Sequence, residues 1–273
     1  MNNNQQLIGI IGYPLKQSLS PVLHNYWISK NNINAHYTAF TIANIKNIDK
    51  AMKVLNIKGL NVTIPHKKTI IKYLDDIETK AAKMEAVNTI LNIKGRLRGY
   101  NTDIFGFKKG LDQLNKWDKK KPVVVLGAGG AAESAVYALI TESCNQIFVM
   151  NRTISKSKRL ANKYKNVIVA PWLSYDIINE AGLIINTTSL GMIGYPDLDV
   201  SLKNSLKDLK VYDVVYNPID TNLIKEAKLR RLDYINGLTM FLGQAEKSFN
   251  IWFRKKPVID QALSKILHNH LKF

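Results

Sequence analysis

One stretch of sequence, residues 123–153, constrains the fold of this chain most strongly. The apolar run Val123–Leu126 is typical of a strand buried on both faces of a parallel sheet, and glycine occupies three of the next four positions. A helix-forming stretch and a second apolar run, Ile147–Met150, follow at βαβ spacing. Because a glycine turn lets backbone amides at a helix start approach a pyrophosphate, the unit predicts a dinucleotide-binding domain, although Ala132 replaces the usual third glycine. A tight turn in an ordinary α/β protein is the alternative.

The end of this βαβ unit indicates which dinucleotide would bind. NAD-binding folds usually place an acidic residue there, about 20 residues past the glycines, to bond the ribose 2′-hydroxyl. This chain has Asn151, Arg152 and Thr153 at that place, with Lys156 close behind. A guanidinium can hold a 2′-phosphate by paired hydrogen bonds, whereas a carboxylate would repel it. The sequence therefore favours NADP, and solvated surface charge is the alternative explanation for both cations.

Length and composition are those of a globular protein. The 273 residues can bury a large core in one or two domains, and 46% of them are hydrophobic. No apolar stretch reaches the roughly 18 residues of a transmembrane helix, and the first residues lack the features of a signal peptide. Cys144 is the single cysteine, which excludes an intramolecular disulfide. We therefore expect a cytoplasmic protein with no membrane partner.

The net charge of +18 and a pI near 9.8 would ordinarily suggest nucleic-acid binding. Apart from the runs at 119–121 and 254–256, however, the lysines are scattered, with no interleaved aromatic residues that would stack on bases. We expect no nucleic-acid partner. A generally basic surface would instead help to collect anionic small-molecule substrates.

The first hundred residues predict a small α/β unit. Its expected strands cover residues 7–13, 36–42 and 58–65, and a hairpin at 88–101 turns at Lys94 and Gly95. Its expected helices begin at Ser20, as an N-cap before Pro21, and cover 45–55, 66–73 and 75–84.

The rest of the chain predicts a doubly wound sheet. A helix from about Thr102 leads through a basic link into the βαβ unit. Further strands are expected near 166–170, 183–187, 210–215 and 232–236, and helices near 239–251 and 257–270 close the chain.

Short polar side chains recur at the ends of the predicted strands in the first hundred residues. They are Ser18, Ser20, Asn61, Thr63, Lys67, Asn88, Asn101 and Asp103. Ligands bind at strand ends of α/β sheets, and hydroxyls, amides and one ammonium suit a small polyhydroxylated acid. Each residue alone also fits a helix cap, a turn or solvated charge. Lys67 beside Asp103 would be able to pass a proton to an alkoxide as it forms.

Nearly the whole chain resembles the shikimate dehydrogenases, NADP-linked enzymes of aromatic amino acid biosynthesis that reduce 3-dehydroshikimate to shikimate. The resemblance is carried, in order, by the segments GYPLKQSLSPVLHN (12–25), GLNVTIPHK (59–67), EAVNTI (85–90), GYNTDIFGF (99–107), GAGGAA (127–132), NRT (151–153), NTTSLGM (186–192), DVVYNP (213–218) and NGLTMFLGQA (236–245).

The resemblance implies a role for each matching residue. It makes Lys67 and Asp103 the catalytic pair. It makes Ser18, Ser20, Asn61, Thr63, Asn88, Tyr216 and Gln244 ligands of the substrate carboxylate and hydroxyls. It places Gly127, Ala128, Gly129, Gly130, Ala131, Asn151, Arg152, Thr153, Lys156, Met192, Val214 and Gly237 at the NADP site, and it implies no metal.

The family fold has two α/β domains. The resemblance implies a discontinuous substrate-binding domain of residues 1–103 plus 238–273 and a Rossmann-type NADP-binding domain of residues 104–237, with catalysis between them. The resemblance leaves open whether the protein is a monomer or a homodimer.

Two positions depart from the family pattern. Lys156 stands where some members have a second arginine, which would keep the charge but lose the planar fork. Glu133 follows GAGGAA, where the family often has a basic or small residue. Its carboxylate would either point to solvent or, facing the pyrophosphate, weaken binding.

The sequence leaves two other functions to weigh. A sister enzyme that oxidises quinate or shikimate with NAD is the nearer one. A non-catalytic binding protein, either a sensor or a lysine-rich nucleic-acid binder, is the more distant one, and the presence of Lys67 and Asp103 speaks against the sensor.

Overall fold

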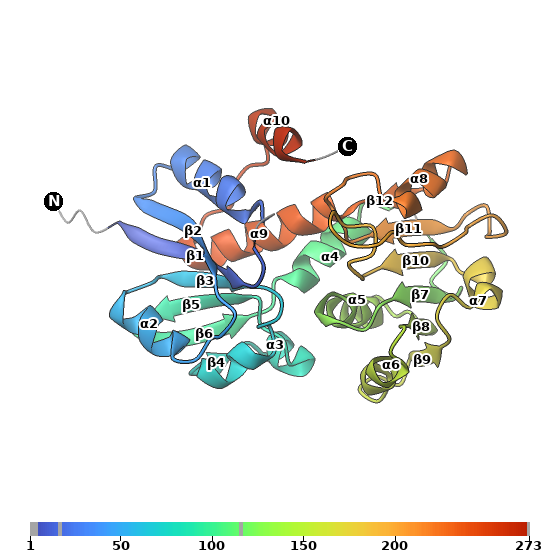
Figure 1. Cartoon of the computed structure of the whole chain (residues 1–273), viewed down its shortest axis with the longest axis horizontal. Coiled ribbons are helices and arrows are strands. Elements are labelled where there is room, and N and C mark those ends of the chain that lie inside the picture. Colours follow the sequence, from blue (N-terminus) through green and yellow to red (C-terminus); the bar gives the residue numbers. More distant parts are fainter. Residues whose placement is uncertain (1–4, 16–17, 115–116, 272–273) are drawn as a thin grey trace. The chain divides into compact units, whose positions relative to one another are not determined.

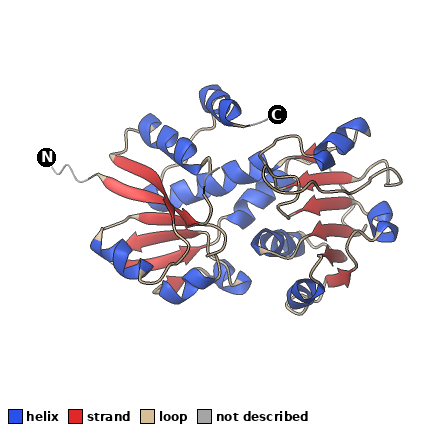
Figure 2. Cartoon of the chain, viewed as in Figure 1, coloured by secondary structure: helices blue, strands red, loops and turns tan. Residues whose placement is uncertain are grey.

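The structure is a computed structural model that describes residues 5–15, 18–114 and 117–271. The chain divides into two compact units (Figure 1). Unit 1 comprises Met1–Thr102 and Gln244–His270, and unit 2 comprises Asp103–Gly243 and Leu271–Phe273. In each unit a sheet is covered by helices (Figure 2), so the predicted two-domain α/β class is confirmed.

A mixed six-stranded sheet forms the centre of unit 1, in the order β2-β1-β3-β5-β6-β4. β1 is parallel to β2 and β3, β5 is antiparallel to β3 and β6, and β4 is parallel to β6. The strands are β1 (Gln6–Gly12), β2 (Ala35–Thr41), β3 (Gly59–Val62), β4 (Asp76–Ile77), β5 (Thr89–Ile93) and β6 (Arg96–Tyr100). The predicted hairpin is confirmed: Lys94 and Gly95 join β5 to β6, and both have the positive φ that a two-residue turn needs.

The two faces of this sheet bury different side chains. One face holds an apolar cluster that joins Leu60 and Ile90 of the strands to Met52 of α2 (Ile48–Val54), Ile70 of the 3₁₀ helix Thr69–Tyr73 and Ala81 of α3 (Thr79–Met84). Because successive strand residues point to opposite faces, Asn61 and Thr89 belong to the other face.

Aromatic side chains from both ends of the sequence fill that second face. Trp27 of α1 (Ser20–Lys30) meets Phe249 of α9 (Gly237–Phe253) edge to face, with ring centroids 5.6 Å apart. Trp252, also on α9, donates its indole hydrogen to the carbonyl of Ile90 at 2.9 Å. A Cβ at Gly59 would lie 2.2 Å from the same indole nitrogen, so the strand needs a glycine there. The C-terminal segment is thus part of the core of unit 1.

The sheet of unit 2 is fully parallel, in the order β12-β11-β10-β7-β8-β9. Its strands are β7 (Val123–Leu126), β8 (Ile147–Met150), β9 (Val167–Ala170), β10 (Leu183–Asn186), β11 (Lys210–Asp213) and β12 (Tyr234–Ile235). Numbered from β7, this is the order 3-2-1-4-5-6 of the Rossmann fold, and the chain reverses direction across the sheet between β7 and β10. The predicted doubly wound sheet is confirmed.

Helices cover both faces of this sheet. On one face, Ile178 of α7 (Tyr175–Glu180) and Leu223 of α8 (Asn222–Leu229) share an apolar cluster with Val211 of β11. On the other face, Tyr212 stacks on Phe107 of α4 (Asp103–Leu111), with centroids 4.8 Å apart. The remaining helices are α5 (Gly130–Thr141) and α6 (Ile154–Ala161) in unit 2 and α10 (Gln261–His270) in unit 1.

Three predicted elements differ from the structure. Residues 66–73 hold a turn and a 3₁₀ helix, and 75–84 divides into β4 and α3, because Asp76 and Ile77 pair with Arg98 and Gly99 of β6. Helix α1 has Leu19 as its cap and begins at Ser20, so Ser20 is not the N-cap. The Ser18 hydroxyl accepts the Ser20 amide hydrogen at 3.4 Å, which starts the turn earlier.

Candidate functional site

Backbone hydrogen bonds join three turns at one edge of the unit 1 sheet. The Val62 amide donates to the Asn88 carbonyl at 2.8 Å, the Val87 amide to the Lys67 carbonyl at 2.8 Å, and the Asn88 amide to the Tyr100 carbonyl at 3.0 Å. The segments that carry Lys67, Asn88 and the residues before Asp103 are therefore held against one another by the main chain.

The Asn61 side chain is fixed within the protein. It is 5% exposed; its oxygen accepts from the Tyr37 hydroxyl at 2.7 Å, and its nitrogen lies within 3.2 Å of the Asn88 carbonyl, the Thr89 hydroxyl and the Ser248 hydroxyl. Tyr37 is fully buried, which raises its pKa well above the ordinary value, while a hydrogen bond with Ser20 lowers it.

Asn88 is held in a similar way. Its side-chain nitrogen donates to the Thr102 hydroxyl at 2.9 Å, and its side-chain oxygen accepts the Thr102 amide hydrogen at 2.7 Å. Asn88 is 3% exposed, so these contacts fix the plane of its amide. Thr102 directly precedes Asp103, the first residue of α4, and the Asp103 carboxylate therefore lies in the positive first turn of that helix. Asn101 is also buried, and its amide nitrogen donates to the Ala86 carbonyl at 3.0 Å.

The remaining predicted residues of unit 1 lie after β3, before α1 and on α9. Ser18, Thr63, Lys67 and Gln244 are half-buried. Thr63 follows β3, and its methyl group packs so closely on Gly12 that a Cβ there would meet it at 2.4 Å. The Gln244 carbonyl accepts from the Ser248 hydroxyl at 2.9 Å. Tyr216 lies in unit 2, stacked on Phe241 with centroids 4.7 Å apart, and burial of its hydroxyl raises its pKa to about 12.

The glycine turn of unit 2 has the shape that a pyrophosphate site needs. Gly127 has a φ of +108°, and a Cβ there would meet the Thr187 hydroxyl at 2.6 Å. Gly129 caps α5, is exposed, and has no atom within 4 Å of the position of a Cβ. Gly130 and Ala131 are half-buried in the first turn of α5, while Ala128 is buried. The start of a twelve-residue helix is therefore open to an anion.

The predicted 2′-phosphate residues follow β8. Arg152 and Lys156 are exposed, and in the described part of the chain no ion pair engages either cation. The Asn151 side chain donates to the Thr153 carbonyl at 2.9 Å, which shapes the turn into α6. Two cations and a polar turn at the tip of β8 fit a phosphate group.

The other predicted cofactor residues follow β10, β11 and β12. The Val214 amide donates to the Asn186 carbonyl at 3.0 Å, and the Gly237 amide to the Val215 carbonyl at 3.0 Å. A Cβ at Gly237 would lie 2.1 Å from the Val214 carbonyl oxygen, so only glycine fits. Met192 is half-buried in the loop after β10. These residues and the glycine turn all lie at the carboxyl edge of one parallel sheet.

Asp213 holds two of these loops together. Its carboxylate accepts hydrogen bonds from the Asn186 side chain at 2.9 Å, the Val215 amide at 3.0 Å and the Thr221 hydroxyl at 2.7 Å. It is fully buried, and desolvation raises its pKa to about 6 against the opposing effect of those bonds.

Glu133 corrects an expectation from the sequence. It is 3% exposed, so its carboxylate does not point to solvent. Instead it accepts a hydrogen bond from the Lys163 ammonium at 2.7 Å. A negative charge buried in the first turn of α5 is stable because this cation lies beside it.

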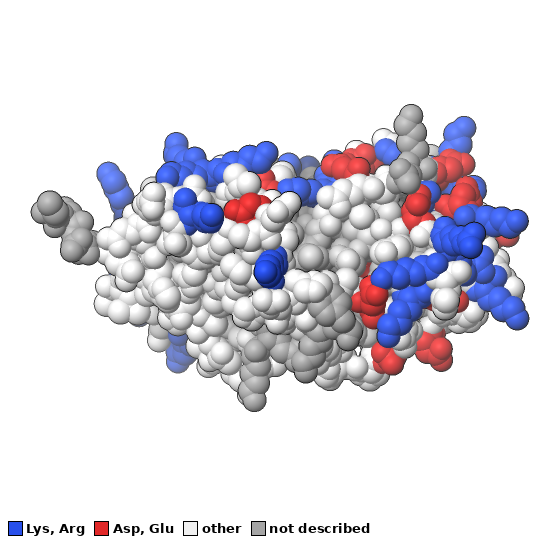
Figure 3. Space-filling model, turned by 90° about the horizontal axis from the view of Figure 1, so that it is seen from above, with Lys and Arg blue, Asp and Glu red and all other residues white. Residues whose placement is uncertain are grey.

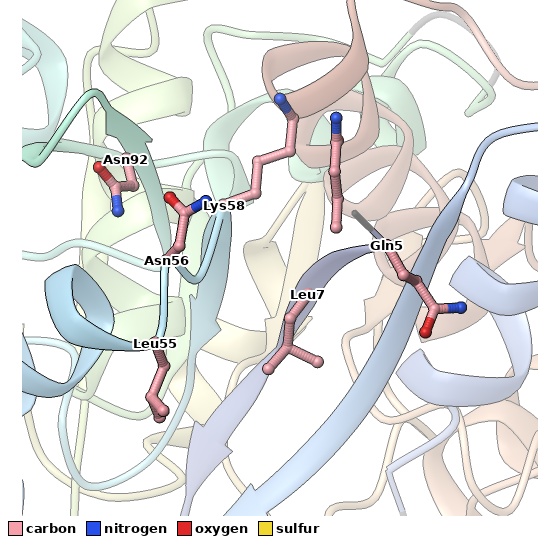
Figure 4. Close-up of a pocket in the computed structure, with 7 residues that line it drawn as sticks. Gln5, Leu7, Leu55, Asn56, Lys58 and Asn92 are labelled. Atoms are coloured by element: carbon pink, nitrogen blue, oxygen red, sulfur yellow. The ribbon is translucent and has the colours of Figure 1, made fainter. Parts of the chain in front are cut away.

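A separate open pocket lies at the opposite ends of the unit 1 strands, at the starts of β1 and β3 (Figure 4). Gln5, Leu7, Leu55, Asn56, Lys58 and Asn92 line it. It contains none of the predicted site residues.

Charge is distributed over the surface. On the face drawn in Figure 3, Lys and Arg side chains are interspersed with Asp and Glu side chains, and part of the face carries neither. In the described residues, no group of three or more His, Cys, Asp or Glu could hold a metal ion. None of the described helices is long and apolar enough to cross a bilayer.

Sequence reasoning missed the residues that hold the site residues in place: Tyr37, Thr89, Thr102, Asp213 and Ser248. Ser248 has one signal in the sequence, since it lies four residues after Gln244 and therefore on the same face of a helix. The pairing of Glu133 with Lys163 has none.

Two family models match the chain. The substrate-binding domain of shikimate dehydrogenase matches residues 10–90, and the shikimate/quinate 5-dehydrogenase model matches residues 109–194.

Individual proteins agree with the family models. A curated relative from Methanococcus maripaludis, a shikimate dehydrogenase (NADP(+)), is 40% identical over 94% of this chain and 95% of its own length. A solved shikimate dehydrogenase in complex with NADP+ has a TM-score of 0.90 at 36% identity, over 100% of this chain and 98% of its own. A solved quinate dehydrogenase from Corynebacterium glutamicum in complex with NAD has a TM-score of 0.88 at 27% identity. The match covers 97% of this chain and 99% of that protein's chain.

Proposed function

The chain belongs to the shikimate dehydrogenase family, and from this we propose that Lys67 and Asp103 are the proton-transfer pair of its reaction. The protein is an NADP-dependent oxidoreductase that reduces 3-dehydroshikimate to shikimate reversibly in aromatic amino acid biosynthesis. NADPH supplies the hydride when it is bound.

Reduction of a carbonyl requires a proton at the oxygen as hydride reaches the carbon. We assign that proton to the Lys67 ammonium. We assign to Asp103 a hydrogen bond to the hydroxyl that forms, and the orientation of Lys67. The observation that most supports this assignment is the set of backbone bonds that joins the Lys67, Asn88 and Tyr100 segments. A proton donor and a substrate amide carried on such segments keep a fixed spacing.

Substrate contacts follow from the same segments. In this proposal the hydroxyls of Ser18, Ser20 and Thr63 and the side chains of Asn61, Asn88, Tyr216 and Gln244 bind the carboxylate and ring hydroxyls of shikimate. NADP is held by Gly127–Ala131 at the pyrophosphate and by Asn151–Thr153 and Lys156 at the 2′-phosphate, with Met192, Val214 and Gly237 beside them. The exposed cations of the β8 tip and the open helix start support this part.

We further propose a domain boundary that assigns residues 1–103 plus 238–273 to substrate and 104–237 to NADP. We also propose a monomer or homodimer in the cytoplasm. A buried single cysteine, Cys144, agrees with a reducing compartment.

The test of the catalytic pair is Lys67→Ala, assayed as absorbance of NADPH formed from shikimate and NADP. We expect turnover to fall by orders of magnitude while shikimate still binds. Near-normal turnover would contradict the assignment.

The same assay with NAD in place of NADP, and with quinate in place of shikimate, tests for the sister activity. A quinate dehydrogenase would prefer NAD and quinate. The wild-type protein is expected to prefer NADP and shikimate.

A further inference from the structure

Ser248 connects its own helix, α9, to three other segments of unit 1. Its hydroxyl is fully buried on α9, donates to the Gln244 carbonyl at 2.9 Å, and lies 2.8 Å from the Thr89 hydroxyl, 3.1 Å from the Thr102 hydroxyl and 3.1 Å from the Asn61 amide nitrogen. A hydroxyl has one hydrogen to donate and can accept about two hydrogen bonds. Three of these four contacts can therefore be hydrogen bonds at one time, which uses its full capacity.

One assignment of the hydrogens accounts for three of these four contacts. The Asn88 side-chain nitrogen donates to Thr102, the Thr102 hydroxyl to Ser248, and the Ser248 hydroxyl to the Gln244 carbonyl. The Asn61 nitrogen donates to Ser248 from the other side. Both asparagine amides thus direct a hydrogen into the network that ends at Ser248, which fixes how each amide is turned.

We propose that Ser248 is a positioning residue for the substrate. Resting on the function proposed above, it sets the orientation of the Asn61 and Asn88 amides and of the peptide that leads from Thr102 into Asp103. It acts through these side chains and not by touching shikimate, since its hydroxyl is completely buried and its partners are protein groups.

Loss of this hydroxyl has a specific physical consequence. An alanine would remove the acceptor that the Thr102 hydroxyl and the Asn61 amide use in this network, and the loss of a hydrogen-bond partner by a buried polar group is costly. These groups would turn to find other partners. The substrate amides would turn with them, while the predicted NADP residues, which belong to unit 2, do not share the network.

The experiment compares Ser248→Ala with Ser248→Thr, which keeps a hydroxyl, and with Ser264→Ala as a matched control. The Ser264 hydroxyl also donates to the carbonyl four residues earlier, at 3.0 Å, but it is exposed on α10. Calorimetry measures the Kd of shikimate and of NADP separately, and the assay measures KM and kcat.

We expect Ser248→Ala to bind shikimate about tenfold more weakly, with the Kd of NADP unchanged. Ser248→Thr and Ser264→Ala should bind shikimate like the wild-type protein. Thr102→Val keeps a similar side-chain volume but removes the hydroxyl that joins Asn88 to Ser248, and it should weaken shikimate binding to a similar extent. This variant tests the proposal if Ser248→Ala fails to fold.

Unchanged shikimate affinity in Ser248→Ala or in Thr102→Val would overturn the proposal, and so would an equal loss of NADP affinity. Wild-type protein that binds no shikimate would overturn the proposed function together with it. Shikimate binding by the wild type that is insensitive to Ser248 would overturn the role of Ser248 alone.

Discussion

The Lys163 ammonium lies 2.7 Å from the Glu133 carboxylate, one turn into the helix that follows the glycine loop. Only 4% of the Glu133 side chain and 22% of the Lys163 side chain are exposed. A carboxylate this close to the proposed pyrophosphate site would oppose a bound anion, and the lysine cancels much of that charge. The pair explains how this chain accommodates a buried acid in the first turn of α5.

Lys163→Met is expected to weaken NADP binding and to lower the free energy of unfolding by about 2 kcal/mol, because the buried carboxylate loses this cation. Glu133→Gln/Lys163→Met removes both charges and should recover most of the loss. Urea unfolding and NADP titration measure the two effects. If Lys163→Met is as stable as the double variant, Glu133 and Lys163 do not stabilise one another.

Arg152→Ala is expected to reduce NADP affinity by about tenfold or more and to leave NAD affinity nearly unchanged, because only NADP carries the 2′-phosphate. Lys156→Arg should bind NADP somewhat more tightly, since it restores a planar fork. Lys158→Ala, an exposed cation on the same helix, is the control. Equal losses for NADP and NAD in Arg152→Ala would contradict a 2′-phosphate role.

We expect His24 to make the stability of the protein sensitive to acid. It stacks on Tyr37 with ring centroids 4.4 Å apart, and neither ring nitrogen has a hydrogen-bond partner within the described residues. Burial lowers its pKa from 6.5 to about 3. The folded state therefore excludes a proton that the unfolded state accepts, so this stability is complete above pH 6.5 and is lost as pH falls toward 3.

Between pH 6.5 and 5 the free energy of unfolding should fall by about 2 kcal/mol through His24 alone. His24→Phe should remove this part of the pH dependence, whereas His36→Gln, at an exposed site, should retain it. Urea unfolding at several pH values tests this, and parallel curves for His24→Phe and wild type would refute it.

Asp213 should change the free energy of unfolding with pH in the direction opposite to His24. Its pKa rises from 3.8 to about 6, so its contribution to stability is complete below pH 3.8 and is lost as pH rises through 6. Asp213→Asn should remove that loss, which amounts to about 3 kcal/mol. Unfolding curves of wild type and variant that keep a constant separation from pH 4 to 7 would show an unshifted carboxyl.

The sequence predicted those parts of the fold that depend on local pattern. The strand, glycine turn and helix at 123–141 follow from apolar runs and backbone freedom, and the 88–101 hairpin from alternation around Lys94 and Gly95. The two-residue strand at Asp76 could not be predicted, because its partner is β6 and its own residues carry no strand pattern.

The same distinction holds for the site. Motif residues such as Lys67 and Asn88 can be recognised from the sequence alone. Their supports are not, because the contacts of Ser248 with Thr89 and Thr102 join residues more than a hundred positions apart. The partner of Glu133 was missed for the same reason, since Lys163 lies thirty residues away on another element.

The place of Trp252 beneath Gly59 and Ile90 also has a consequence for biosynthesis. A ribosome delivers β1 to β6 first, then the Asp103–Gly243 part of unit 2 as one uninterrupted piece, and only then the part of α9 that carries Phe249 and Trp252. We expect protease resistance in stalled nascent chains to appear in unit 2 before unit 1, and earlier resistance in residues 1–102 would contradict this. The usual order of co-translational folding, in which the amino-terminal domain folds first, is then reversed. The sheet of unit 1 cannot complete its core until the aromatic side chains of α9 have been synthesised.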